Sequence, residues 1–336
     1  MRASNFLSLC ALSVASLSGI TAAQDVVRVG HLSIAADGPL YIAMEKGYFK
    51  EANIEIRLES FASAVTAMAP LSSGEIQVVG GGIGPPLFNA YARAFPVRVV
   101  GARSRNVPGN SGDTLMVRKD LVAQIRRAAD LKGRKVAVNA PGSPLTYLVG
   151  KLLESEGLSL KDVDLVNMPW PDMAPAFDKR AIEVGALVEP FSSLYSDKGL
   201  GDVWKRASDV LKGPGWEIAV LFYNDDWAKK NPRAANEFMV AYIKASRDMM
   251  QAWNRGKNRA EIIDIMVKHT RVKDRALYDK MHWGHVDPNG EILKDSIRDQ
   301  QEFFAKLGQV PKMVDIDAII DARYVKYALQ KLGVQR

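Results

Sequence analysis

The chain has 336 residues, of which 47% are hydrophobic and 25% are charged, and its formal net charge is +7. This is the composition of an ordinary globular protein, and the length favours two domains. Basic residues are scattered among acidic ones without a Lys/Arg run or an interleaved aromatic platform, so we expect no nucleic-acid partner.

The amino terminus has the pattern of a secretory signal peptide. Arg2 provides a positive charge, residues 6–20 are apolar or small, and small residues precede Gln24. This pattern predicts cleavage after Ala23 and a periplasmic mature protein. The apolar run is shorter than the about 20 residues that a transmembrane helix needs.

The only cysteine, Cys10, lies within the predicted signal peptide. Leu9 precedes it, where a lipoprotein cleavage site has Gly or Ala, so we expect no lipid anchor. The mature chain would then have neither a disulfide nor a reactive thiol, and a core of this size needs no covalent cross-link.

After the signal peptide, short β-branched runs alternate with segments of helical periodicity. We expect strands over 26–31, 54–59, 76–80 and 97–102, and helices that begin at Pro39 and cover 64–71 and 86–93. A polar segment with two glycines and a proline follows at 106–112 and is typical of a crossing between domains. This alternation predicts an α/β unit with a mainly parallel sheet.

A second, similar cycle follows. We expect strands over 114–118, 135–139, 163–168 and 184–188, with helices after Ser143, Asp172 and Pro190. After the loop 213–216, a strand over 218–223 would return the chain to the first unit. The rest is mostly helical, including a long segment over 233–255, and we expect these helices to pack on the first unit.

These elements predict a signal peptide over 1–23 and two lobes joined by two crossings. Lobe I would comprise 24–105 and 222–336, and lobe II would comprise 106–221. Ligands of open parallel sheets bind beyond the carboxyl ends of the strands, so two such units that face each other predict a cleft for a small solute.

Several segments, in this order along the chain, resemble the periplasmic solute-binding proteins of ABC importers, within their nitrate/sulfonate/taurine-binding branch, which is related to thiamine-pyrimidine-binding proteins. They are PLYIAMEKGYF at 39–49, LSSGEI at 71–76, DLKGRKVAV at 130–138, EP at 189–190 and IDARYVKYALQKLG at 320–333. The resemblance implies a type II periplasmic-binding-protein fold, hinge closure on a solute, and a permease and an ATPase as partners.

Candidate solute contacts lie where strands give way to helices. Helix N-termini offer free N–H groups and partial positive charge, so they hold carboxylate, sulfonate or nitrate oxygens without a metal. Small or hydroxylated residues at such junctions are Ser33, Ser63, Gly82 and Ile83 in the glycine run 80–84, Asn139 and Ser143. Ser63 and Ser143 are equally explained as helix N-caps. The glycine run lacks the spacing and position of a dinucleotide fingerprint and is better explained by a close approach to a solute or to the opposite lobe.

Four larger side chains are also candidates. Arg103 ends a predicted strand and either pairs with an anion or lies at the surface. Trp170 lies between two prolines and is a candidate wall of the cleft. Trp216 either walls the cleft or packs between the lobes. Glu189 either receives a cationic group or bridges to Arg103 or a backbone N–H.

The sequence contains no motif of an established catalytic class. His282 and His285 with Asp287 provide only local ligands, so we expect no metal site there, and we expect no cofactor. Nucleophile elbow, P-loop and zincin motifs do not occur.

We therefore expect a monomeric binding protein that delivers a small organic anion, such as a sulfonate, a taurine-like compound or an aromatic carboxylate, to an ABC permease. Two alternatives stay open: an enzyme on the same fold, such as a pyrimidine synthase or a dehydratase, and a sensor that reports solute to a membrane receptor. The synthases rely on a cysteine-rich motif, which the mature chain lacks.

Overall fold

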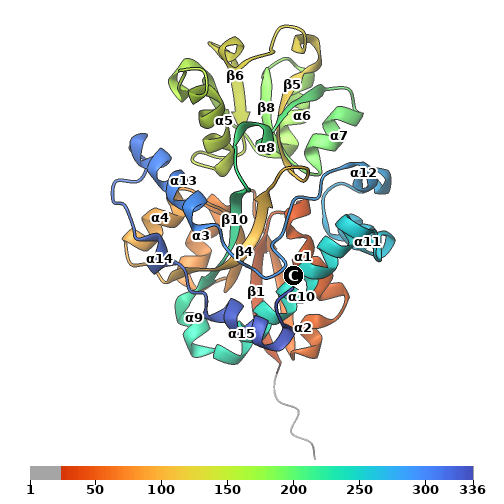
Figure 1. Ribbon diagram of the computed structural model, residues 1–336, viewed down its shortest axis with the longest axis vertical. Coiled ribbons are helices and arrows are strands. Elements are labelled where there is room, and N and C mark those ends of the chain that lie inside the picture. Colours follow the sequence, from red (N-terminus) through yellow and green to blue (C-terminus); the bar gives the residue numbers. More distant parts are fainter. Residues whose placement is uncertain (1–23, 336) are drawn as a thin grey trace, which may run out of the picture.

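The computed structural model describes residues 24–335, so the predicted signal peptide, its cleavage site after Ala23 and Cys10 lie outside the described residues. The chain forms two lobes, each built on one sheet with helices packed around it (Figure 1). We call lobe I the part with the strand order β2-β1-β3-β10-β4 and lobe II the part with the order β7-β6-β8-β5-β9. The two-lobe α/β fold is thus confirmed, while the predicted boundaries at residues 105/106 and 221/222 stay a prediction.

The sheet of lobe I contains strands from two separate parts of the chain. Its strands are β1 (Asp25–His31), β2 (Ile54–Ser60), β3 (Val78–Gly82), β4 (Val97–Asn106) and β10 (Trp216–Asn224). β1 pairs in parallel with β2 and β3, whereas β10 is antiparallel to both β3 and β4. The sheet is therefore mixed, because the returning strand β10 runs against its neighbours.

Helices cover this sheet at the predicted places. They are α1 (Gly38–Glu45), α2 (Tyr48–Glu51), α3 (Ala64–Ser73) and α4 (Pro85–Ala92).

β3 begins two residues later than predicted because Gln77 belongs to a turn. The Gln77 side chain accepts a hydrogen bond from the Arg28 amide at 2.8 Å and donates one to the Gly74 carbonyl at 2.9 Å.

The two crossing strands are longer than predicted. β4 continues to Asn106 instead of ending at residue 102, and β10 begins at Trp216 instead of Ile218. The two strands pair from Val97–Asn224 to Asn106–Trp216 with irregularities in the register, and the amides of Ala102 and Arg105 on β4 donate instead to the carbonyls of Gly290 and His285. Trp216 is consequently a strand residue and not part of the predicted loop.

Lobe II repeats the plan. Its strands are β5 (Asp113–Arg118), β6 (Lys135–Val138), β7 (Asp164–Asn167), β8 (Val184–Val188) and β9 (Gly201–Arg206), and its helices are α5 (Pro144–Glu154), α6 (Trp170–Asp178), α7 (Phe191–Asp197) and α8 (Ala207–Val210). The sequence analysis missed β9, an edge strand antiparallel to β5. Its sequence GDVWKR has one β-branched residue and three charged ones, so it lacks a clear strand signal.

The remaining chain forms α9 (Asp225–Lys230), α10 (Pro232–Arg255), α11 (Arg259–His269), α12 (Arg275–Lys280), α13 (Lys294–Lys306), α14 (Ile316–Ile319) and α15 (Arg323–Leu332). α10 packs on α1 and α15, as expected for lobe I. We expected all these helices to pack on lobe I, but two of them also contact lobe II: α12 contacts α7, and α13 contacts α5. Among the described helices, none is long and apolar enough to cross a bilayer.

Candidate functional site

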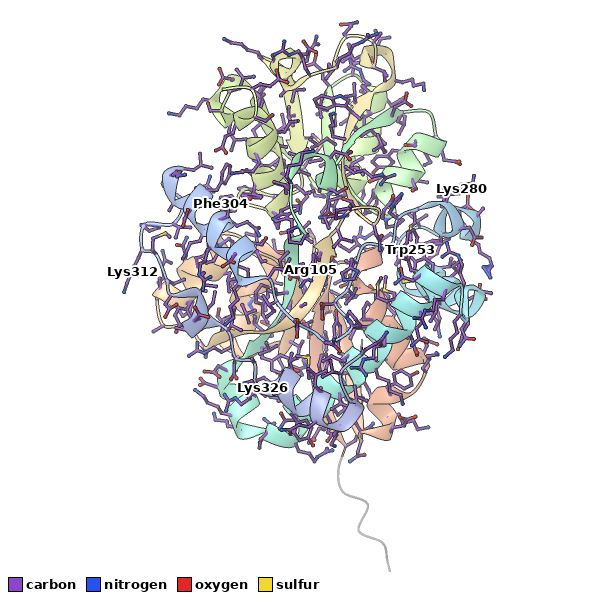
Figure 2. All side chains as sticks on the ribbon, viewed as in Figure 1. Arg105, Trp253, Lys280, Phe304, Lys312 and Lys326 are labelled. Carbon is purple, nitrogen blue, oxygen red and sulfur yellow. The ribbon has the colours of Figure 1, made fainter. Side chains whose placement is uncertain are left out.

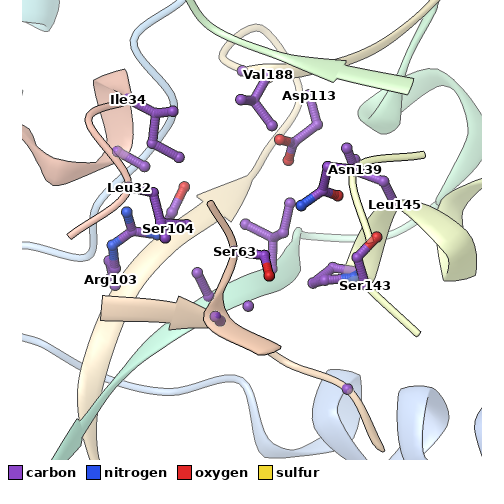
Figure 3. A pocket seen from close by; sticks show the side chains of 18 of the residues that line it. Leu32, Ile34, Ser63, Arg103, Ser104, Asp113, Asn139, Ser143, Leu145 and Val188 are labelled. Atoms are coloured by element: carbon purple, nitrogen blue, oxygen red, sulfur yellow. The ribbon is translucent and has the colours of Figure 1, made fainter. Parts of the chain in front are cut away.

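A cavity of about 70 Å³ lies between the two lobes and has walls from both (Figure 3). The structure places seven of the ten predicted contact residues on these walls. From lobe I they are Ser63, Gly82 and Arg103, and from lobe II Asn139, Ser143, Trp170 and Glu189. These residues are brought together because strands and strand–helix junctions of both lobes meet there; their contact with a solute stays a prediction.

The other three predicted residues lie elsewhere. The Ser33 hydroxyl is 3.4 Å from Nδ1 of His31. Ile83 is fully buried in the hydrophobic core. Trp216 of lobe I stacks on Tyr147 of lobe II with ring centroids 5.4 Å apart and lines a separate groove, which matches the alternative that it packs between the lobes.

The two serines at helix starts behave differently. Ser63 is the N-cap of α3, and its Oγ accepts a hydrogen bond from the Thr66 amide at 3.4 Å. Ser143 stands at the N-cap of α5, but its buried Oγ has no hydrogen-bond partner among the described residues. A buried hydroxyl without a partner carries a free-energy cost, so Ser143 is the serine whose side chain is available to a bound molecule.

Arg103 is buried and not a surface residue. Its Nη2 lies 2.6 Å from Oδ1 of Asp37, and both side chains are almost fully buried. The other carboxylate oxygen of Asp37 accepts hydrogen bonds from the amides of Leu32 and Ile34. The sequence analysis missed Asp37; its place two residues before the predicted first helix is the signal that pointed to it.

Glu189 follows β8, and its side chain binds the first turn of α7. Its carboxylate accepts hydrogen bonds from the Ser193 hydroxyl at 3.0 Å and from the Ser193 amide at 3.1 Å. Burial raises the pKa of Glu189 to about 7, although the Ser193 hydrogen bonds act in the opposite direction. Within the described chain Glu189 makes no ion pair with Arg103. Of the two bridges expected from the sequence, the structure shows the one to a backbone N–H, that of Ser193.

Asp113, the first residue of β5, is a cavity residue that the sequence analysis missed. Its Oδ2 accepts a hydrogen bond from Nδ2 of Asn106. Burial raises the pKa of the Asp113 carboxyl to about 7, while the Asn106 hydrogen bond and the nearby Arg103 lower it and Glu189 raises it further. Its position directly after the predicted crossing segment 106–112 was the available signal.

Two tryptophans form apolar walls. Trp170, the first residue of α6, is 6% exposed, and its buried Nε1 has no partner among residues 24–335. Trp283 was not predicted; its Nε1 donates to the Tyr278 carbonyl at 2.8 Å, so only its ring faces the cavity region. The segment around His282 and His285 thus serves as a wall, and among the described side chains no group of three or more metal-ligating residues gathers anywhere.

The lobes touch beside the cavity through small residues. A Cβ atom at Gly84 would lie 2.3 Å from the carbonyl oxygen of Gly142, and one at Gly82 would lie 2.6 Å from Cγ of Pro144. The Ala35 amide also donates to the Glu189 carbonyl across the cleft at 3.1 Å. The glycine run therefore permits a close approach of lobe I to lobe II, one of the two explanations that the sequence offered.

Comparison with known proteins gives a consistent picture. A family model described as NMT1/THI5 like matches residues 36–252. The chain is 24% identical over 303 residues to a Bacillus subtilis (strain 168) protein named "Putative aliphatic sulfonates-binding protein", covering 87% of this chain and 85% of that one.

Two solved structures are similar in fold. The alkanesulfonate-binding protein SsuA from Xanthomonas axonopodis pv. citri bound to MOPS has a TM-score of 0.72 at 20% identity, over 90% of this chain and 99% of that one. The periplasmic nitrate-binding protein NrtA from Synechocystis PCC 6803 has a TM-score of 0.73 at 17% identity, over 93% of this chain and 90% of that one.

Proposed function

The chain belongs to the NMT1/THI5 like family, and from this premise we propose that it is an extracytoplasmic solute-binding protein. It captures a small organic anion between its lobes and delivers it to an ABC permease driven by an ATPase. The similar proteins are named as sulfonate- and nitrate-binding proteins, which supports this function.

The observation that carries the proposal is the cavity with walls from both lobes. Arg103 and Ser63 approach from lobe I and Asn139 and Ser143 from lobe II. A solute that bridges such walls favours the closed arrangement, because each of its ends gains contacts only when the lobes meet. A transporter can then recognise the closed form.

The unpartnered polar atoms of the cavity support a solute with hydrogen-bond acceptors. Oγ of Ser143 and Nε1 of Trp170 are both buried without a protein partner. A sulfonate or a carboxylate would accept hydrogen bonds from them, and the rings of Trp170 and Trp283 would cover an alkyl or aromatic body. We propose a sulfonate, a taurine-like compound or an aromatic carboxylate, bound without turnover by a monomer.

Calorimetry on the mature chain, with a panel of sulfonates, carboxylates, nitrate and pyrimidines, tests this function. We expect at least one organic anion to bind and to raise the melting temperature. Gly84→Ala should weaken that binding at least about tenfold, because the added methyl meets the Gly142 carbonyl and disfavours the closed form. Gly157→Ala is the control: alanine is strained at its φ of +73°, but no atom lies within 4 Å of the added methyl, so this variant should lose stability and keep its affinity for the solute.

Two outcomes would contradict the proposal. Either no member of the panel binds and no solute is released on denaturing protein purified from its own host, or Gly84→Ala binds as tightly as the wild type. Conversion of a bound compound by the purified protein would revive the enzyme alternative instead.

Location and partners need separate experiments. We propose that the signal peptide is cleaved after Ala23, so the mature protein in the periplasmic fraction should begin at Gln24 by amino-terminal sequencing. Deletion of the gene should abolish uptake of the solute by cells. Unchanged uptake with an altered transcriptional response would favour the sensor alternative.

A further inference from the structure

The charges on the cavity walls do not favour a simple anion. Three charged residues line the cavity: Arg103, Asp113 and Glu189. Arg103 is paired with the buried Asp37 directly behind it, at 2.6 Å. The positive charge is therefore balanced before any solute arrives, and two carboxyl groups remain.

Of these two carboxyl groups, Asp113 has an oxygen to spare. Both oxygens of Glu189 accept hydrogen bonds from Ser193. Oδ2 of Asp113 accepts one from Asn106, whereas no described residue donates to Oδ1. Figure 3 shows the Asp113 carboxyl pointing into the cavity, across from Arg103.

Asp113 is also held in a defined position. Its amide donates to Oδ1 of Asn106 at 3.3 Å, and the same oxygen accepts a hydrogen bond from the Ser111 hydroxyl at 2.8 Å. As the first residue of β5, it pairs with Val188 of β8. The spare oxygen is therefore a preorganised acceptor, and the buried Oδ1 of Asn139 on the same walls is a second acceptor without a partner.

We propose that Asp113 is a specificity-determining residue that binds a nitrogen-borne donor of the solute, an ammonium or an amino group. This rests on the proposed function and deepens it: the solute carries an N–H group in addition to the acidic group that faces Ser143 and Trp170. An ionised carboxylate forms its strongest hydrogen bonds with cationic donors.

The surroundings of Asp113 predict a proton signature for this contact. Asn106, Arg103 and Glu189 are the polar groups that face it, and burial leaves its pKa near 7. A cationic nitrogen at Oδ1 would lower this pKa, so binding near neutral pH should release a proton. Calorimetry in buffers of different ionisation enthalpy measures that release.

Matched probes test the proposal on the mature chain. We would compare 2-aminoethanesulfonate with ethanesulfonate, and 4-(aminomethyl)benzenesulfonate with 4-methylbenzenesulfonate. In each pair that binds, we expect the amine to bind at least about tenfold more tightly to the wild type. Asp113→Asn and Asp113→Ala should abolish the preference and the proton release, whereas Asp120→Asn, at an exposed ion pair with Arg118, should keep both.

The outcomes separate this proposal from the proposed function. If the amine-free probes bind as tightly as the amines, or if the preference survives both Asp113 substitutions, the proposal is overturned while the binding function stands. If no probe binds, we would measure the exact mass of the solute that is released from protein purified from its own host. A composition with nitrogen supports the proposal, one without nitrogen overturns it, and the absence of any solute overturns the binding function as well.

Discussion

Two arginines on the same strand, Arg103 and Arg105 of β4, have very different surroundings. Arg105 donates to Glu217 of β10 through Nε and Nη2, at 3.2 and 3.0 Å, and to the Glu291 carbonyl at 2.8 Å, and it lies 3.5 Å from Asp287. Arg103 has one hydrogen-bond partner among the described residues, Asp37. Figure 2 shows Arg105 near the middle of the molecule, close to where the lobes join.

From this difference we infer a structural role for Arg105 and propose a binding role for Arg103. A guanidinium has five N–H donors, and Arg105 uses most of its capacity to tie both crossing strands to the carboxy-terminal segment. Arg103 keeps donors in reserve at the cavity wall. Gly80 on the neighbouring strand β3 makes room for it, since a Cβ there would lie 2.4 Å from Nε of Arg103.

The largest expected effect is loss of stability on Arg105→Ala. Glu217, which is fully buried, would lose its cation, and breaking a buried pair in this way costs about 3–5 kcal/mol of the free energy of unfolding. Urea denaturation measures the change. The exposed pair of Arg57 with Glu55 is the control, and Arg57→Ala should cost only about 0–1 kcal/mol. If Arg105→Ala costs no more stability than the control, the structural role of Arg105 is contradicted.

Arg103→Ala should cost less stability but should also weaken solute binding. Asp37 would keep the hydrogen bonds from two amides, those of Leu32 and Ile34, whereas Glu217 would keep only the one from the Leu293 amide and has one buried oxygen without a partner. We therefore expect a loss of about 2–3 kcal/mol in the same denaturation experiment. Calorimetry should show a lower affinity for the solute. Unchanged affinity together with a stability loss equal to that of Arg105→Ala would show that both arginines are structural.

Gly80→Ala tests the position of Arg103 without removing its charge. The added methyl would overlap Nε and Cδ of Arg103, and such overpacking costs about 1–3 kcal/mol. We expect weaker solute binding because the guanidinium must move. Gly101→Ala on β4 is the matched control, since its nearest neighbour is the flexible end of Met239 at 3.0 Å. Equal affinity in both variants would argue against a precise placement of Arg103.

The smallest effect concerns pH and the carboxyl groups beside the two arginines. Burial raises the pKa of Asp113 and of Glu217 to about 7 in the folded protein, above the ordinary values of 3.8 and 4.5. Burial in the folded protein favours the protonated form of each carboxyl. The stability that this form contributes is therefore present at low pH and is lost as the pH rises through about 7. Between about pH 6 and pH 8 each group should therefore lower the free energy of unfolding by about 1 kcal/mol.

Asp113→Asn and Glu217→Gln each remove one titrating group. Between about pH 6 and pH 8, each variant should therefore lose about 1 kcal/mol less of its free energy of unfolding than the wild type loses. Urea denaturation at several pH values measures it. A bound cationic solute should abolish the contribution of Asp113 but not that of Glu217. A pH dependence that neither substitution alters would contradict both assignments.

Much of the fold could be predicted because it depends on local patterns. β-branched runs and helix-starting prolines predicted most strands and helices, and Ser63, Asn139 and Ser143 lie where strand–helix junctions placed them. The edge strand β9 escaped because its residues carry little strand preference of their own and gain their backbone partners only from β5.

Tertiary structure alone decided the chemistry of the cavity. Asp37 and Arg103 are 66 residues apart in the chain, and no periodicity links them. Asp113 lies between the predicted crossing segment 106–112 and the predicted strand 114–118, and Trp283 reaches the cavity from the region beyond α12. Residue types and local spacing determine which strands and helices form, whereas burial and charge pairing arise between distant segments. The sequence therefore indicated where a solute would bind, and only the folded chain showed that its one arginine there is already neutralised.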